Sequence, residues 1–152
     1  MDIVPASVWT LHVAFAALWT GSVLFVTATV IPAGAAGDVG AEALSAIVGR
    51  LRTFTRVSAL VLFLTGGHMA GTTYTVERLT GTGRGHLVLS MLVLWLVLAG
   101  IVEAGSGKLL SGLDAGKLRE PVRESRTLFR AAAAVSVLLL ITGGVLASNV
   151  VA

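Results

Sequence analysis

Four long runs of apolar residues follow one another along the chain, separated by shorter polar segments. They extend over residues 8–32, 57–75, about 87–110 and about 131–151. Roughly 20 apolar residues cross the ~30 Å hydrocarbon core of a bilayer as a helix, so each run is long enough for one span. The pattern predicts an all-α, polytopic membrane protein: a four-helix bundle that forms a single transmembrane domain over residues 1–152.

Apolar residues also recur at helical spacing between the first two spans, over residues 41–54. They are Leu44, Ile47, Val48, Leu51 and Phe54. Such a stripe, with polar residues beside it, is typical of a helix that lies in the membrane interface. A helical extension of the second span is an equally good interpretation.

Composition agrees with a membrane location. Of the 152 residues, 55% are hydrophobic and only 12% are charged, and the mean hydropathy is +0.91. A soluble domain of this size does not need so much apolar sequence. Because the chain has no cysteine, disulfides and thiolate metal sites are excluded.

Basic residues predict the orientation of the spans. Nine lie in or beside the first and third connections, whereas the second connection has only Arg78 and Arg84. The nine are Arg50, Arg52, Arg56, Lys108, Lys117, Arg119, Arg123, Arg126 and Arg130. By the positive-inside rule, both termini are expected on the outer side of a multi-pass protein of the cell membrane. Because these bases flank spans, lipid is the expected partner and nucleic acid is not.

The second and fourth spans contain a weak internal repeat. LFLTGGHMA at Leu62–Ala70 aligns with LLITGGVLA at Leu139–Ala147, which suggests two helical hairpins of the same orientation. Gly67 and Gly71 form a GxxxG pattern in the second span. Such glycines permit close helix packing in lipid, and they equally leave room for a flat ligand.

Histidines supply the candidate chemistry. In the predicted topology, His12 and His68 lie roughly 7 and 10 Å below the outer ends of their spans, at 1.5 Å per residue. His86 stands at the outer mouth of the third span. Ionisable or ligating groups inside a span are costly and are functional candidates by default. Any one of these imidazoles could equally well be a core residue that hydrogen-bonds a neighbouring helix, but two at one depth on consecutive spans favour a shared ligand.

Haem b is the first interpretation. A four-helix bundle commonly holds haem between imidazoles on two helices, and we expect His12 and His68 as axial ligands with His86 as an alternative. Gly67 and Gly71 would let the macrocycle approach. The expected function is redox chemistry or electron transfer in the outer half of the membrane.

Two further residues are expected near this site. Trp19 follows His12 by seven residues and so lies on the same helix face, where it could pack on a ligand or simply fill the core. Arg84 could reach haem propionates at the polar edge, or anchor the helix end in the interface.

Copper is the alternative ligand. His12, His68 and His86 together with Met91 offer the imidazole and thioether groups that copper prefers. A third interpretation is a structural accessory subunit of a membrane complex, or a homo-oligomer. No Ser/His/Asp set or paired carboxylates are present, so we assign no catalytic residue and leave open whether the chain is an oxidoreductase.

Three segments resemble a known family. LHVAFAALWTGSVLFVTATVIP, with His12, Trp19, Gly21 and Pro32, resembles the first helix of the CopD-type copper-resistance membrane proteins. RLRTFTRVSALVLFLTGGHMAG is similar to the family's second helix, and LFRAAAAVSVLLLITGGVLAS to its last. This resemblance implies a copper-handling membrane protein.

The related HemJ-type four-helix proteins bind haem b and have a histidine in the first helix and a lysine opening the third. By position, His12 would take the first role. His86 stands where that lysine is expected, and the two side chains differ in charge and ligation. The resemblance therefore implies a haem site more than protoporphyrinogen oxidation.

Overall fold

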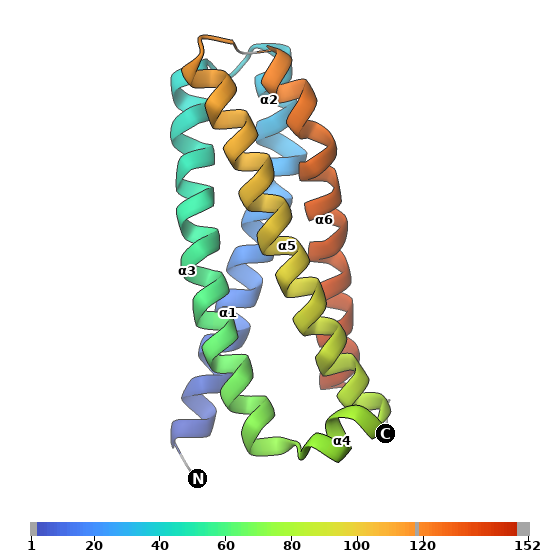
Figure 1. Ribbon diagram of the computed structural model, residues 1–152. Helices are drawn as coiled ribbons and strands as arrows, with labels where there is room; N and C mark the ends of the chain where they lie inside the picture. The colour runs from blue at the N-terminus through green and yellow to red at the C-terminus, as the bar shows by residue number, and fades with distance from the viewer. Residues whose placement is uncertain (1–2, 118, 149–152) are drawn as a thin grey trace.

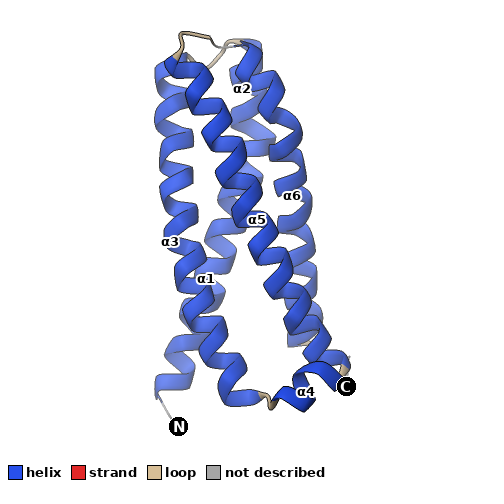
Figure 2. Ribbon diagram, viewed as in Figure 1, coloured by secondary structure: helices blue, strands red, loops and turns tan. Residues whose placement is uncertain are grey.

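The computed structural model describes residues 3–117 and 119–148, and the regular elements of this part are all helices (Figures 1 and 2). They are α1 (Ile3–Phe25), the π-helical turn η1 (Val26–Val30), α2 (Ile31–Ala36), α3 (Ala41–Thr73), α4 (Val76–Gly81), α5 (Gly83–Asp114) and α6 (Arg119–Ala147). No strand occurs in the described ranges, so the predicted all-α class is confirmed.

The long helices lie side by side (Figure 1). α1 continues through η1 into α2, and it packs against α3 and α6; α5 packs against the same two helices. α1 and α5 are therefore diagonal to each other. We call the end with α4 the α4 end, and the end with the turns at residues 37–40 and 115–117 the turn end. The described chain begins and finishes at the α4 end.

Several predicted boundaries change. Residues 41–54 do not form a separate interfacial helix; the alternative interpretation is confirmed, because they continue without a break into the second predicted span as α3. The first helix runs on to Ala36, and the last begins at Arg119. Residues 149–151 of the fourth predicted span lie outside the described residues.

Three helical stretches in the described chain are long and apolar enough to cross a membrane: Ala6–Ala36, Gly83–Asp114 and Arg119–Ala147. They contain the first and third predicted spans and most of the fourth. α3, which contains the second, is of similar length but does not reach the same apolar content. Its apolar run holds His68 and several threonines and glycines, and it begins directly after Arg56.

The core is closed toward the turn end and open toward the α4 end. The buried positions nearest to the α4 end are Trp19 on α1, Thr65 on α3, Leu98 on α5 and Ser136 on α6. Beyond these four residues, Gly85 is the only buried position among those described. Inward-facing side chains in this half are therefore only partly covered by the protein itself.

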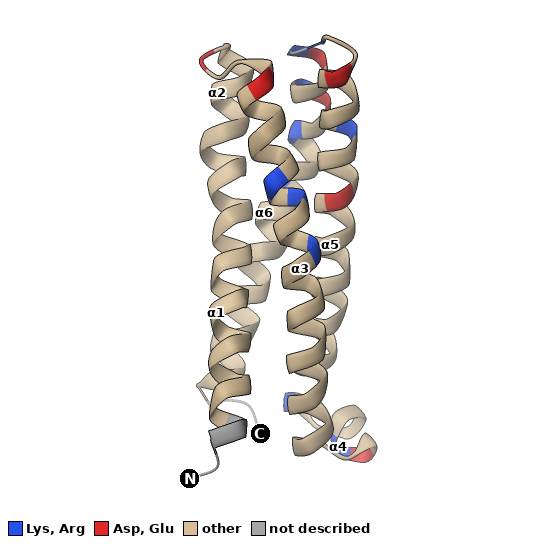
Figure 3. Ribbon diagram, turned by 90° about the vertical axis from the view of Figure 1, so that its left-hand side faces the viewer, with Lys and Arg blue, Asp and Glu red and all other residues tan. Residues whose placement is uncertain are grey.

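Charged side chains gather in the half nearer to the turn end, as far as Arg56 near the midpoint of α3, and they recur only close to the α4 end (Figure 3). Glu103 of α5 accepts hydrogen bonds from two arginines of α3: Arg52 Nε lies 2.8 Å from Oε1, and Arg56 Nε lies 3.1 Å from Oε2. A second ion pair joins Lys108 to Glu124 of α6 at 3.0 Å. These contacts fix α5 against both neighbours at the turn end.

Candidate histidine site

His12 is half-buried in the contact between α1 and α3. Its Nδ1 lies 2.8 Å from Thr65 Oγ1, and that hydroxyl in turn lies 2.7 Å from the Val61 carbonyl oxygen. A carbonyl can only accept, so the single hydroxyl proton goes to Val61. The neutral His12 ring must then donate from Nδ1, which leaves the lone pair on Nε2 for a proton or a metal.

The His12 ring packs directly against the backbone of α3 at Gly66. A Cβ placed on Gly66 would lie 3.1 Å from His12 Cε1, closer than ordinary van der Waals contact. Any side chain at this position would push the ring away. Thr65 and Gly66 were not among the predicted ligand-binding residues. Their repetition as Thr142 and Gly143 in α6 was the signal that could have found them.

Trp19 lies on the same face of α1 as His12 and closes the site toward the turn end. Its side chain is 1% exposed, and its indole Nε1 donates to Thr55 Oγ1 at 3.0 Å. Because Thr55 is also 1% exposed, both polar groups would be unsatisfied without each other. Trp19 is therefore fixed by α3, as His12 is.

His68 is exposed on α3, whereas Thr65 and Gly66 of the same helix contact His12 of α1. The structure thus brings His12 to Thr65 and Gly66 rather than to His68. Gly67 and Gly71 are exposed too, and a Cβ on either would have no neighbour within 4 Å. The GxxxG pattern does not pack against another described helix.

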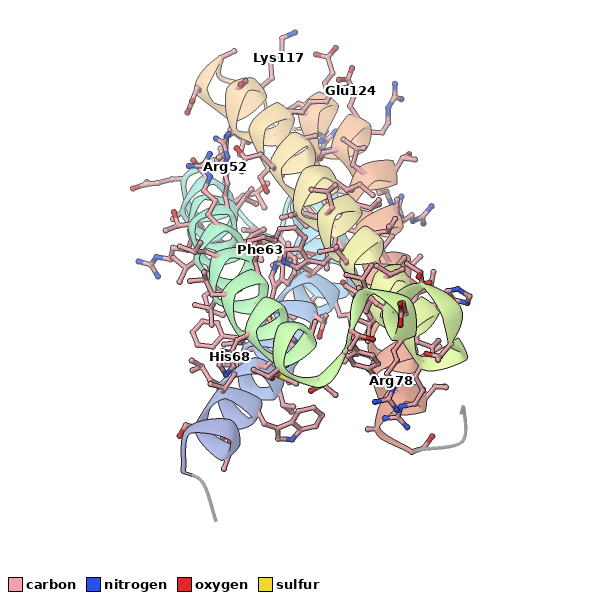
Figure 4. The ribbon with its side chains drawn as sticks, turned by 60° about the horizontal axis from the view of Figure 1, so that its bottom comes forward. Arg52, Phe63, His68, Arg78, Lys117 and Glu124 are labelled. Atoms are coloured by element: carbon pink, nitrogen blue, oxygen red, sulfur yellow. The ribbon has the colours of Figure 1, made fainter. Side chains whose placement is uncertain are left out.

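His86 and Arg84 lie near the start of α5, where His86 contacts α4 and Arg84 contacts α6. The exposed His86 ring donates from Nε2 to the Thr80 carbonyl oxygen at 2.8 Å. Arg84 Nη2 donates to the Leu146 carbonyl oxygen near the end of α6 at 3.2 Å. Figure 4 shows Arg78 of α4 on the opposite side of this end from His68.

Met91 is half-buried on α5 and faces α6. Its Cε lies 3.6 Å from the position that a Cβ on Gly143 would take. Within the described part of the chain, no group of three or more His, Asp or Glu side chains is close enough together to hold a metal ion. The predicted copper ligands His12, His68, His86 and Met91 therefore do not form a closed metal site of three histidines.

No family model matches the chain, and no curated protein or solved structure matches it either. The resemblance to the CopD-type and HemJ-type families stays a prediction that rests on the residues quoted above. The geometry around His12 is accordingly the main basis for a functional proposal.

Proposed function

We propose that this chain is an integral membrane protein that binds haem b in a four-helix bundle and serves redox chemistry or electron transfer, with His12 as an iron ligand. One observation carries the proposal. His12 directs its Nδ1 proton to Thr65, and within the described residues its Nε2 has no hydrogen-bond partner. Metal-ligating histidines almost always have their other ring nitrogen fixed in this way.

The low burial around His12 also supports the proposal. Between Trp19 and the α4 end, no described residue of α1 is buried, and in the same half of α3, α5 and α6 the only described buried residue is Gly85, which has no side chain. A side-chain core that is incomplete over half its length leaves apolar surface for a ligand of haem's size to cover. Gly66 allows the His12 ring to lie directly against the backbone of α3.

Each residue then has a definite task. His12 would coordinate, Thr65 would fix the tautomer and direction of the imidazole, and the Trp19–Thr55 pair would exclude water from the turn-end side. Bound haem b supplies reversible one-electron chemistry. In a low-dielectric bundle, the protein would tune that chemistry mainly through its axial ligands.

We further propose four spans, with α3 crossing the membrane beside α1 and α5 and with both termini outside. The support is the contact of α3 with both neighbours and the concentration of basic residues at the turn end (Figure 3). Anionic headgroups and the positive-inside rule favour the inner surface for that end.

Single cysteines test this topology, because the chain has none of its own. Asp38 and Glu77 are exposed, at the turn end and on α4 respectively. A membrane-impermeant maleimide should label Glu77→Cys in intact cells and Asp38→Cys only after permeabilisation. Labelling of both variants in intact cells would show that α3 does not cross, and the reverse pattern would invert the proposed orientation.

An absorption spectrum tests the haem proposal. After expression with ample haem, the purified protein should carry about one haem b per chain and show Soret and α bands in the reduced-minus-oxidised spectrum. A folded but colourless protein would refute the proposal. Stoichiometric copper in such a colourless protein would favour the CopD-like alternative, and absence of both would favour an accessory subunit.

A further inference from the structure

We propose that Met91 is the second axial ligand of the haem, so that the iron is held by His12 of α1 and Met91 of α5. This inference rests on the proposed haem function and replaces the expected pairing of His12 with His68. Four observations carry it: two independent estimates of height along the bundle, a repeated helix contact, and a repeated spacing to the core.

The contact between α3 and α5 gives the first estimate of height. Trp95 Nε1 donates to the Ala59 carbonyl oxygen at 3.2 Å, and the Trp95 and Phe63 rings stack with their centroids 5.5 Å apart. Trp95 is thus level with the midpoint of Ala59 and Phe63, at about residue 61 of α3. About one helical turn (four residues) closer to the α4 end, Met91 of α5 is level with Thr65 of α3, the residue that His12 contacts.

The contacts of α6 give the second estimate. Thr27 Oγ1 of the first helix donates to the Phe129 carbonyl oxygen at 3.1 Å. Thr27 and Phe129 are therefore at the same height. Counting fourteen residues from each toward the α4 end, about 21 Å at 1.5 Å per residue, reaches Val13 on α1 and Gly143 on α6, which are again level. Because Met91 contacts Gly143, it lies at the height of His12 by this route too, within about one residue.

The two hairpins repeat the same contact. In the first, His12 of α1 lies against Gly66 of α3; in the second, Met91 of α5 lies against Gly143 of α6. The threonines before these glycines match as well, because Thr65 donates to Val61 O and Thr142 to Leu138 O, both at 2.7 Å. His12 and Met91 therefore pack against equivalent glycines of the aligned LFLTGGHMA and LLITGGVLA segments.

Spacing to the closed core is also the same on α1 and α5. His12 precedes Trp19 by seven residues, and Met91 precedes Leu98 by seven. Followed from the α4 end, Trp19 is the first buried residue described on α1, and Leu98 is the first buried side chain on α5, after the glycine Gly85. Their side chains are 1% and 0% exposed. His12 and Met91 thus occupy equivalent positions on diagonal helices, one on each side of the loosely packed half.

The chemistry of the pair is appropriate for haem iron. Imidazole and thioether ligands together raise the reduction potential relative to two imidazoles. His68 does not share these features, because it is exposed and lacks an equivalent in α6, where Val145 takes its place. Met69 is half-buried on α3 and is not a proposed ligand. It is therefore the control methionine for the test below.

The test compares Met91→Leu with Met69→Leu, because leucine conserves volume and apolar character but cannot ligate iron. In haem-loaded protein, Met91→Leu should lose the low-spin six-coordinate ferric spectrum and the red charge-transfer band of a sulfur ligand, and Met69→Leu should keep both. Met91→His should restore a low-spin spectrum with a lower midpoint potential.

A Met91→Leu protein whose spectrum and potential equal those of the wild type would overturn the Met91 assignment and leave the haem function intact. A colourless wild-type protein would overturn both, whether or not it carries copper. If Met91→Leu does not fold, Met91→His decides: an unchanged midpoint potential in that variant also overturns the assignment.

Discussion

Replacement of Trp19 by alanine is expected to lower the free energy of unfolding by about 3–5 kcal/mol, the usual range for a fully buried aromatic side chain. Trp19 is 1% exposed, and it lies where the closed core begins on α1. Its loss would leave a cavity between α1 and α3 and would also strand the buried Thr55 hydroxyl. Unfolding in detergent micelles, followed by circular dichroism, measures the change.

Trp9 provides the matched control on the same helix, because its side chain is 50% exposed. Trp9→Ala should change the free energy of unfolding by less than about 1 kcal/mol. Trp19→Phe separates packing from hydrogen bonding and should cost about 1–3 kcal/mol, since it keeps most of the volume but leaves Thr55 unpaired. Equal stabilities of Trp19→Ala and Trp9→Ala would contradict the described packing of α1 on α3.

His12→Ala is expected to abolish haem binding, because it removes the ligand whose tautomer Thr65 fixes. Thr65→Val keeps the shape of the contact but not the acceptor for the Nδ1 proton. Loss of such an outer partner typically lowers metal affinity by about 10–100-fold. Haem titration of the purified apoprotein would measure both changes.

The other histidines are the controls for this prediction. His68 is exposed, and the His86 ring is held by the Thr80 carbonyl at the corner between α4 and α5. His68→Ala and His86→Ala should therefore bind haem with the affinity of the wild type. Loss of binding in His68→Ala with normal binding in His12→Ala would reverse the assignment of the ligand.

Helix type and order could be predicted from the sequence because each apolar run is long and uninterrupted. The extents of the helices could not. The pattern of residues 41–54 fitted an interfacial helix and an extension of the second span equally well, and the structure shows the extension, because Leu44, Val48 and Leu51 pack into the same core as α5 and α6. Hydrophobic periodicity identifies a buried face but does not say where the helix axis bends or continues.

The site was predicted in part. His12 was selected by counting residues along the first predicted span, and the structure places its ring between α1 and α3. Depth alone also favoured His68, but the face of α3 on which a residue lies depends on how the helix is rotated against its neighbours. That rotation is set by side-chain contacts such as Trp19–Thr55 and His12–Thr65, which a single sequence does not encode in its spacing.

The central claim is that His12 holds haem in the loosely packed half of the molecule. The most direct measurement is the haem-to-protein ratio of the wild type, His12→Ala and His68→Ala, purified in parallel and recorded as reduced-minus-oxidised spectra. We expect about one haem per chain in the wild type and in His68→Ala, and none in His12→Ala. Equal haem content in the wild type and His12→Ala, or no haem in any of the three, would contradict the claim.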